Sequence, residues 1–453
     1  MLSSTFARFI VVAFVFCSFG DAYSHSQSKT TERVYVLGSE DIYIIEPESK
    51  TILFTIGADG LCTQSKRYPR KKCSFGDGIL VRDDLIFLSD SPGNRVHIID
   101  TRKGKVVETV ATEGYPYDLY YLPWMEEVWV HSWTLSTFDV INVKGNLEKT
   151  HKAIKAHVKP GWTHGFMLAD PEIKDGKSGY VSHLFNPGIH QLDLDSKSYK
   201  GFVNVSDLGC SGTLYFAYSS LNKHAFVQCY AYRTSVGLLE MDLTKEQVVR
   251  KWNVPGRPYA SPDGRFILTL FAPVNETVDV LLDSKVHVLF ISKEGSPAIQ
   301  KHTLHIPSGV SELVYVKKTD QQDGYLAFIS LLYSDKMAVL DLDQLESGSD
   351  AVSYIHGVGS VITDEHAVSR SMVLSGRWLL SPANANNTVA IIDTSTRKLH
   401  GIVMGVVGGD ELIAIPPPLP PSLPSPTAAA ERVWRSKGTA IIVFLSSLLK
   451  LML

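Results

Sequence analysis

The sequence carries little excess charge of either sign. Its 44 Lys and Arg residues nearly balance 47 Asp and Glu residues, which leaves a net charge of −3 over 453 residues. This balance argues against a nucleic-acid-binding protein, and a hydrophobic share of 44% argues against a disordered or collagen-like chain. Long acidic runs are absent as well, which disfavours a mineral-binding protein of the extracellular matrix.

The motifs that would identify an enzyme are missing. The sequence contains no HExxH, no pair of CxxC motifs and no GxSxG, and no nucleophile and base stand at a diagnostic spacing. Its 15 histidines are scattered along the chain rather than clustered. We therefore expect no catalytic residue, no metal ligand and no cofactor.

The N-terminal residues are typical of a secretory signal. Arg8 supplies a positive charge, residues 9–19 are apolar, and Ala22-Tyr23-Ser24 is a small-x-small cleavage site. The apolar run is too short for a membrane span. We expect cleavage after Ser24 or Ala22, so that residues 1–24 are lost and residues 25–33 lead into the folded part.

Cysteines are few. Of the five in the chain, Cys17 lies in the signal and four remain. An even number of cysteines in an exported chain indicates two disulfides. Among the three possible connectivities, we prefer the pairs Cys62–Cys73 and Cys210–Cys229.

The composition changes abruptly after residue 415. Residues 416–430 begin with a proline-rich run that predicts a stiff stalk. Small residues around Ala428, a polar stretch and a short apolar end follow in the order of a glycosylphosphatidylinositol (GPI) attachment signal, which would remove residues 431–453. A transmembrane tail is the alternative, but the apolar end is short for a span and contains Lys450. We expect Ala428 to carry a lipid that holds the protein on the outer leaflet of the plasma membrane, or else a location in the extracellular matrix.

A short apolar cassette repeats along the chain. Residues 94–101 read NRVHIIDT and residues 387–394 read NTVAIIDT. An apolar run that ends in an acidic residue and a polar turn is typical of two antiparallel strands joined tightly. Six further copies end at residues 46, 142, 193, 240, 290 and 341, although Gln191 interrupts one run and Phe290 replaces the acidic residue of another.

The spacing of the cassettes predicts an all-β, eight-bladed β-propeller over residues 34–415. Copies recur roughly every 40–55 residues, as propeller blades do. Residues 33–37 look like a second strand without a predecessor, and residues 408–415 look like an inner strand without a successor. Pairing them would close the ring and remove exposed sheet edges. Seven blades are the alternative, if the weak copy around Val286 is not a strand.

One face of such a propeller is the candidate binding face. It carries the loops that enter the inner strands and the loops that leave the second strands, and aromatic, His and Asn side chains around a central channel could bind a ligand. The sequence places ten such residues there: Asp90, Asn94, His131, Trp133, Trp162, His164, His183, Asn186, Tyr230 and Arg233.

A basic loop and three sequons are further candidate sites. The loop between Cys62 and Cys73 is the only dense charge run and could bind a sulfated glycan or an acidic protein surface, although a solvated loop or a protease site is equally compatible. Its cations are Lys66, Arg67, Arg70, Lys71 and Lys72. The sequons predict surface glycans at Asn204, Asn275 and Asn386.

Three runs, residues 31–47, 75–133 and 161–196, resemble the C-terminal propeller of the follistatin-related (follistatin-like) extracellular proteins. The resemblance covers most of residues 31–415 and implies a secreted, non-enzymatic binding module. The chain has no cysteine-rich follistatin segment, no immunoglobulin Cys–Trp–Cys spacing and no EF-hand loop, so the resemblance does not imply calcium binding.

Together these features predict an extracellular binding, adhesion or signalling-modulator module tethered to the cell surface. Its partner would be an extracellular protein or a sulfated glycan. The alternatives are a propeller hydrolase of the lactonase kind that uses the His-bearing face, and a structural component of the extracellular matrix. Fold alone does not choose among them.

Overall fold

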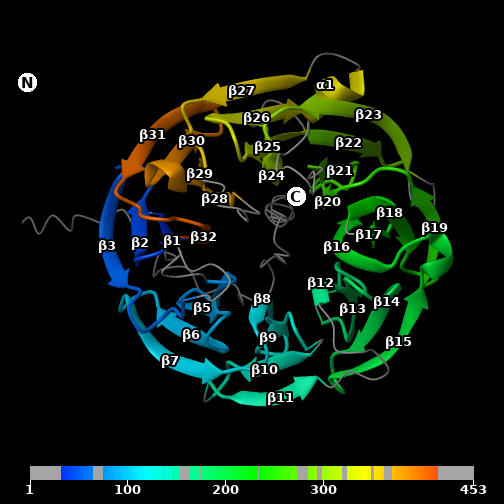
Figure 1. Ribbon diagram of the computed structural model, residues 1–453, viewed down its shortest axis with the longest axis horizontal. Coiled ribbons are helices and arrows are strands. Elements are labelled where there is room, and N and C mark those ends of the chain that lie inside the picture. Colours follow the sequence, from blue (N-terminus) through cyan, green and yellow to red (C-terminus); the bar gives the residue numbers. More distant parts are fainter. Residues whose placement is uncertain are drawn as a thin grey trace, which may run out of the picture.

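Eight four-stranded antiparallel sheets surround a central axis in the computed structural model of the protein (Figure 1). The structure describes residues 32–64, 75–135, 137–145, 147–153, 163–173, 175–232, 234–272, 284–292, 298–318, 324–347, 351–361 and 370–416. The prediction of an eight-bladed β-propeller is confirmed. The seven-bladed alternative is wrong, because the weak cassette around Val286 is the third strand of a complete blade.

Each blade runs from an inner strand at the axis to an outer strand at the rim. Blades 1 to 4 comprise, from the inside outwards, β32 (Glu411–Ile415), β1 (Arg33–Leu37), β2 (Asp41–Glu46) and β3 (Thr51–Gly57); β4 (Gly78–Val81), β5 (Leu85–Asp90), β6 (Arg95–Asp100) and β7 (Lys105–Ala111); β8 (Pro116–Leu122), β9 (Glu127–Ser132), β10 (Phe138–Asn142) and β11 (Lys149–Ala153); and β12 (Thr163–Leu168), β13 (Ser178–His183), β14 (Gly188–Asp193) and β15 (Ser198–Asn204).

Blades 5 to 8 follow the same order. They comprise β16 (Gly212–Ser219), β17 (His224–Ala231), β18 (Thr234–Asp242) and β19 (Gln247–Trp252); β20 (Arg257–Ala260), β21 (Phe266–Phe271), β22 (Ser284–Phe290) and β23 (Ile299–Ile306); β24 (Val310–Lys317), β25 (Tyr325–Leu331), β26 (Lys336–Asp341) and β27 (Val352–His356); and β28 (Val373–Ser375), β29 (Trp378–Ala383), β30 (Thr388–Asp393) and β31 (Lys398–Met404). Helix α1 (Leu342–Ser347) and the 3-10 turns η1 (Ser206–Leu208) and η2 (Asn384–Asn386) lie in connections.

The two ends of the described chain close the ring. Strand β1 pairs antiparallel with β32, from Arg33 opposite Ile415 to Leu37 opposite Glu411. Blade 1 therefore takes its inner strand from the C-terminal side and its other three strands from the N-terminal side (Figure 1). The predicted closure is confirmed.

The acidic residue that ends the cassette caps the turn to the outer strand. In blade 2, Asp100 Oδ1 accepts hydrogen bonds from the backbone N–H groups of Arg102 (2.9 Å) and Lys103 (3.0 Å). In blade 8, Asp393 Oδ1 accepts in the same way from Ser395 (2.9 Å) and Thr396 (3.2 Å). The repeat was visible in the sequence because Asp stabilises this turn through its own side chain.

In seven blades the outer strand carries one extra residue opposite the third strand, a β-bulge that lies just before the last residue of the cassette. In blade 5 the register shifts between Glu240 and Met241, because Val249 of the outer strand is the extra residue. Asp242 caps the turn by accepting from the N–H of Thr244 at 2.9 Å. The cassette of blade 5 thus ends at Asp242, and the placement of its end at Glu240 was wrong. Glu240 is instead buried and accepts a hydrogen bond from Trp252 Nε1 at 2.9 Å.

The hydrophobic core lies between the blades. One cluster joins Val34 and Tyr43 of blade 1 to Trp378 and Val389 of blade 8, and another joins blades 2 and 3. Since each blade buries its faces against its neighbours, the ring folds as one unit.

Several predicted features lie outside the described residues. They are the signal over residues 1–24, the residues that follow it as far as 31, the proline-rich segment from residue 417, Ala428, the apolar tail, Cys73, the basic run from Lys66 to Lys72, Trp162, Arg233 and Asn275. Within the described ranges, no helix has both the length and the apolar character that a membrane crossing requires.

Candidate binding face

The loops that enter the inner strands and the loops that leave the second strands meet on one face, as the strand order requires. The N–H of Thr112 donates to Asn94 O at 2.9 Å, that of Trp133 to Tyr115 O at 3.1 Å, and that of Val205 to Pro187 O at 2.8 Å. Each of these bonds joins an entering loop to a neighbouring second-strand loop. The face is therefore a continuous layer of mutually braced loops.

Asp90 and Asn94 brace this layer. The fully buried carboxylate of Asp90 accepts from Thr63 Oγ1 at 2.8 Å and from Arg95 Nε at 2.8 Å. Asn94 adopts a φ of 53° and accepts from the N–H of Tyr115 at 2.8 Å. Both side chains hold one loop to the next, so they shape the face rather than present groups to a ligand.

Two predicted histidines lie inside the blades. His131 is 0% exposed, with Nδ1 3.6 Å from Asp118 Oδ2 and its ring stacked on Phe138 at 5.0 Å. His183 is 1% exposed, and its ring centroid lies 4.4 Å from that of His190. In this conformation a substrate on the face does not reach either ring.

The other predicted residues are distributed over three blades. Trp133 stacks on Tyr117 at 5.3 Å and remains partly exposed. Asn186 Oδ1 lies 3.0 Å from His190 Nε2, and His164 belongs to β12. Tyr230 is partly exposed near the end of β17.

The hairpin of β17 and β18 is the longest second and third strand pair in the described ring, at eight and nine residues. Its loop consists of only two residues, because Ala231 pairs with Thr234. Tyr232 stands in this loop with a φ of 49° and is 92% exposed. Tyr232 was not among the residues predicted from the sequence, although a two-residue gap between two apolar runs is a hairpin signal.

The base of this hairpin is fixed on both sides. The predicted disulfide between Cys210 and Cys229 is confirmed and ties β17 to the preceding loop, with a Cα–Cα distance of 5.4 Å. The N–H of Ser211 donates to Tyr230 O at 2.8 Å, and the N–H of Gly256 donates to Ser235 Oγ at 2.8 Å. Cys62 is disulfide-bonded as well, while its predicted partner Cys73 lies outside the described residues. These links hold the exposed tyrosine on a rigid support.

A second exposed aromatic residue stands beside the hairpin. Phe185 is 61% exposed on the second-strand loop of blade 4. A Cβ at Gly212 would lie 1.7 Å from Leu184 O, so this loop packs directly on the start of β16, and only glycine fits there. Phe185 and Tyr232 thus belong to adjoining loops of the same face.

Bulges at the entry ends of the inner strands form a further group of residues that sequence reasoning missed. The register shifts between Pro116 and Leu119 in β8, between Thr163 and Gly165 in β12, between Thr213 and Phe216 in β16 and between Val310 and Leu313 in β24. A bulge leaves residues unpaired in the ladder and redirects side chains, and bulges are frequent next to functional sites. A bulge has no signature in a single sequence, because it depends on the partner strand.

The two sequons in the described part of the chain are accessible. Asn204 is exposed at the end of β15, and its Oδ1 accepts from the N–H of Ser206 at 2.9 Å. Asn386 is exposed at the end of η2 and accepts from the N–H of Ser360 at 3.2 Å. A glycan at either position would point into solvent.

The described residues contain no group of three or more His, Cys, Asp or Glu side chains that could hold a metal ion. No family model matches the chain. Among solved structures, the chain is similar to AztD of Citrobacter koseri, with 10% identity, a TM-score of 0.55 and coverage of 84% of this chain and 97% of that one.

Several of the similar structures are named as enzymes. The periplasmic gluconolactonase PpgL of Pseudomonas aeruginosa has 12% identity and a TM-score of 0.50, covering 85% of this chain and 99% of that one. The dihydro-heme d1 dehydrogenase NirN has 12% identity and a TM-score of 0.52, covering 71% of this chain and 64% of that one. At these identities the likeness shows that the chain shares the propeller fold, and it shows nothing finer.

Proposed function

We propose that this protein is an exported β-propeller, held at the cell surface, that binds a partner protein through the tip of the blade 5 hairpin. The observation that carries the proposal is the position of Tyr232: a bulky side chain at positive φ, 92% exposed, directly above the disulfide-linked end of β17.

The backbone at Tyr232 is unfavourable for a tyrosine. Positive φ is an outlier for bulky residues, whereas Asn, Asp and Gly adopt it readily in two-residue hairpin loops. Because the side chain is almost fully exposed, contacts within the described chain do little to offset this strain. Strained and exposed residues concentrate at functional sites.

The surroundings of Tyr232 suit a protein partner. Tyrosine and arginine are enriched among the residues that dominate interface energies, and Arg233 follows directly in the sequence. Phe185 adds a second exposed ring on the adjoining loop. The disulfide below the tip reduces the ordering cost of binding, as rigid aromatic loops do in antibodies.

The extracellular location is part of the same proposal. The Cys210–Cys229 disulfide fits an oxidising compartment. The N-terminal signal, the stalk and the GPI-type tail expected from the sequence would bring the propeller to the outer leaflet. The follistatin-related resemblance would make it a secreted binding module, and a sulfated glycan is the alternative partner.

Site-specific photocrosslinking tests the proposal. A benzophenone amino acid at position 232 of the full chain, displayed on cells of the native tissue, should give a covalent protein adduct. The same amino acid at position 333 is the matched control, because Tyr333 is 43% exposed on the second-strand loop of blade 7 on the same face. Excess wild-type protein should suppress the adduct.

The variant Tyr232→Asn separates binding from folding. Asparagine tolerates positive φ, so this variant should be at least as stable as the wild type, yet it should not compete for the adduct. Equal adducts at positions 232 and 333, or full competition by Tyr232→Asn, would contradict the proposal. An adduct lost after heparinase treatment would favour the glycan.

An enzyme is the second candidate, and the buried pair His131 and Asp118, 3.6 Å apart, is the observation that favours it. A histidine beside a carboxylate is a common arrangement of a general base, although His131 Nδ1 makes no hydrogen bond at this distance among the described residues. Hydrolysis of a lactone by the purified protein, lost in His131→Ala with the fold retained, would establish this alternative.

A further inference from the structure

We infer that the mouth of the central channel binds a small monocarboxylate through Arg257. This site is independent of the hairpin tip, since it uses residues of the inner strands and faces the axis of the ring.

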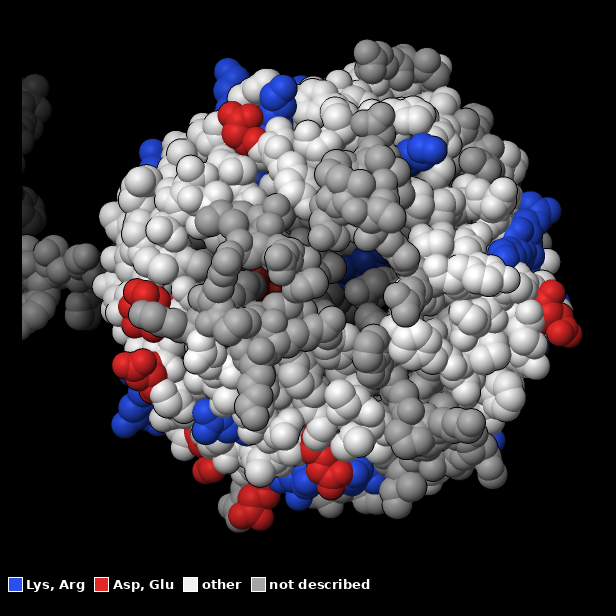
Figure 2. All heavy atoms as spheres, in the orientation of Figure 1, with Lys and Arg blue, Asp and Glu red and all other residues white. Residues whose placement is uncertain are grey.

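Arg257 is nearly alone as a cation on the channel wall. Among the eight inner strands, the only Lys and Arg residues are Arg257, the first residue of β20, and Lys317, the last residue of β24. Arg257 therefore lies at the entry end and Lys317 at the opposite end. Figure 2 shows basic atoms deep in the central hollow and a few acidic atoms across from them.

The guanidinium of Arg257 lies against two aromatic rings, and the charge of Glu312 acts on it without a direct ion pair among the described residues. Its Cζ is 4.0 Å from the ring centroid of Tyr215 and 5.2 Å from that of Tyr259. No carboxylate among the described residues forms an ion pair with it, and its buried Nη2 has no hydrogen-bond partner there. A buried donor without an acceptor is costly, and a carboxylate is the acceptor that matches the guanidinium fork.

A second donor stands next to the guanidinium. Tyr259 is fully buried, and its hydroxyl has no hydrogen-bond partner among the described residues. Burial raises the pKa of Tyr259, so the hydroxyl stays protonated and can donate. Two neighbouring donors that lack an acceptor among the described residues point to a ligand that supplies one.

The bulges build an arc of side chains on both sides of Arg257. They place Tyr117, Tyr215 and Glu312, all partly exposed, at the entry ends of β8, β16 and β24. Together with Arg257, these residues span blades 3 to 7. The flat rings of Tyr117 and Tyr215 around the Arg257 guanidinium suit a small organic acid.

Acidic residues restrict the charge of the ligand. Glu312 is fixed, because its Oε2 accepts from the N–H of Met372 at 2.9 Å and its N–H donates to Ser330 Oγ at 3.1 Å. Glu411 is partly exposed at the entry end of β32. The guanidinium attracts a single negative charge, and carboxylates at the same end of the inner strands repel the further charges of a polyanion.

Buried Arg370 fixes the wall next to Glu312. Its guanidinium donates to Leu331 O at 3.1 Å, Val358 O at 2.7 Å and Gly359 O at 2.9 Å, and its backbone N–H donates to Ser311 Oγ at 2.7 Å. The segment that leads to Met372 is thereby anchored to β24, so the carboxylate of Glu312 keeps its place before a ligand arrives.

Calorimetric titration of the purified full chain tests the inference. The probes are glucuronate, a hydroxylated monocarboxylate, and alanine, a zwitterionic one, with citrate and phosphate as polyanions. We expect one monocarboxylate to bind and the polyanions not to bind. Arg257→Gln should weaken binding by about 10- to 100-fold, the loss expected for a charged hydrogen bond.

Two further variants keep the result interpretable. Arg102→Gln removes one positive charge from an exposed turn (the Arg102 side chain is 73% exposed) and should bind like the wild type. Glu312→Gln removes a negative charge that repels polyanions, so this variant should bind citrate. The melting temperature of Glu312→Gln shows whether the fold is intact. Preference for citrate by the wild type, equal binding by Arg257→Gln, or no binding of any probe would overturn the inference. Failure of the photocrosslink at position 232 would contradict the proposed function but would leave the inference about Arg257 unaffected.

Discussion

Three histidines share one position in the repeat, three residues before the last residue of the cassette. They are His97, His190 and His287, and all three are buried. Burial lowers the pKa of each, that of His190 to about 4. At neutral pH they act as uncharged polar residues inside the blades.

This position makes the fold sensitive to mild acid. The folded-state pKa of His190 lies below its ordinary value, so the unfolded chain binds the proton more readily. The contribution of neutral His190 to the free energy of unfolding is fully present above about pH 6.5. As the pH falls toward 4, the protein loses roughly 2–3 kcal/mol of this stability. Urea unfolding of wild type and His190→Phe between these pH values should show the wild type losing more stability. The exposed His305→Phe is the control and should leave the slope unchanged; an unchanged slope for His190→Phe would contradict the prediction.

At the same scale, the sequence predicted the capping residues because Asp and the turn residues are local. It misplaced the cassette of blade 5 because VGLLE and LLEMD both end in an acidic residue after an apolar run. The bulge and the pairing of Asp242 with Gln247 decide between them, and both depend on the neighbouring strand.

Among the elements, the strands and their order were predictable, whereas the features that form the candidate sites were not. Alternating apolar runs and turn residues identify a strand wherever it pairs. The inner-strand bulges and the length of the β17–β18 hairpin depend on how each strand pairs with its neighbour. A single run of residues does not reveal that pairing. The residues predicted from the sequence, such as Asp90 and His131, therefore lie at the ends of second strands, and the structure adds Tyr232 and Arg257.

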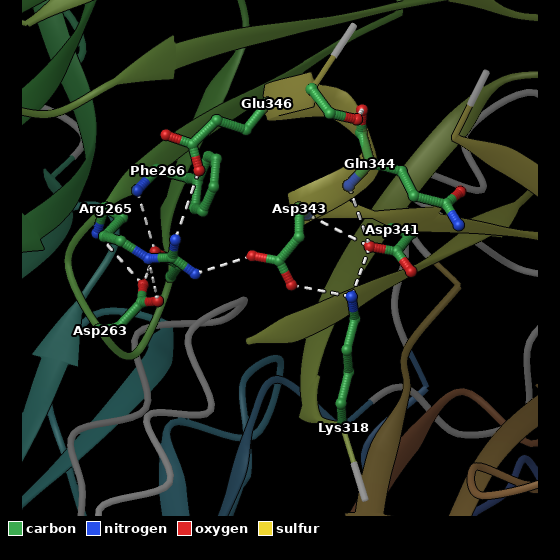
Figure 3. Close-up of polar contacts among 10 residues, drawn as sticks. Asp263, Arg265, Phe266, Lys318, Asp341, Asp343, Gln344 and Glu346 are labelled. Carbon is green, nitrogen blue, oxygen red and sulfur yellow. Dashed lines mark hydrogen bonds and ion pairs between the residues drawn. The ribbon is translucent and has the colours of Figure 1, made fainter. Parts of the chain in front are cut away.

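Connections between elements also join neighbouring blades on the opposite face (Figure 3). Asp343 of α1 accepts from Arg265 Nη2 of blade 6 at 3.0 Å and from Lys318 Nζ of blade 7 at 2.8 Å. Although burial raises the pKa of Asp343, the hydrogen bonds from Lys318 and Arg265 lower it overall. The cluster is an ion-pair network rather than an isolated surface pair.

A double-mutant cycle measures this connection. Arg265→Ala and Asp343→Ala should show a coupling of about 0.5–1 kcal/mol, because both side chains are roughly one-third exposed and partly screened. The pair Arg102 and Asp84, whose arginine is 73% exposed, should show a smaller coupling. The difference should shrink in 1 M salt. Equal couplings for the two pairs would mean that the network adds nothing beyond a surface pair.

For the whole molecule, the ring and its closure follow from the number of cassettes and from the two unmatched ends. Eight similar units that bury their faces on one another leave one strand edge at each end. The pairing of β1 with β32 removes both edges. The N–H of Ser39 also donates to Val407 O, and that of Asp410 to Leu37 O, each at 3.0 Å, so the loops beside the closing strands are joined too.

Closure should therefore be required for a soluble product. Deleting residues 33–37 removes the strand that lies between β32 and β2, which exposes two edges and separates the inner strand of blade 1 from its sheet. Exposed edges pair with other chains, so the deletion should leave the protein aggregated or retained inside the cell. The measurement is the secreted fraction and its size by gel filtration. Deleting five residues of the proline-rich segment, 417–421, is the matched control and should be secreted normally. A stable, secreted monomer without residues 33–37 would show that seven complete blades and a partial one suffice, and that the terminal pairing is dispensable.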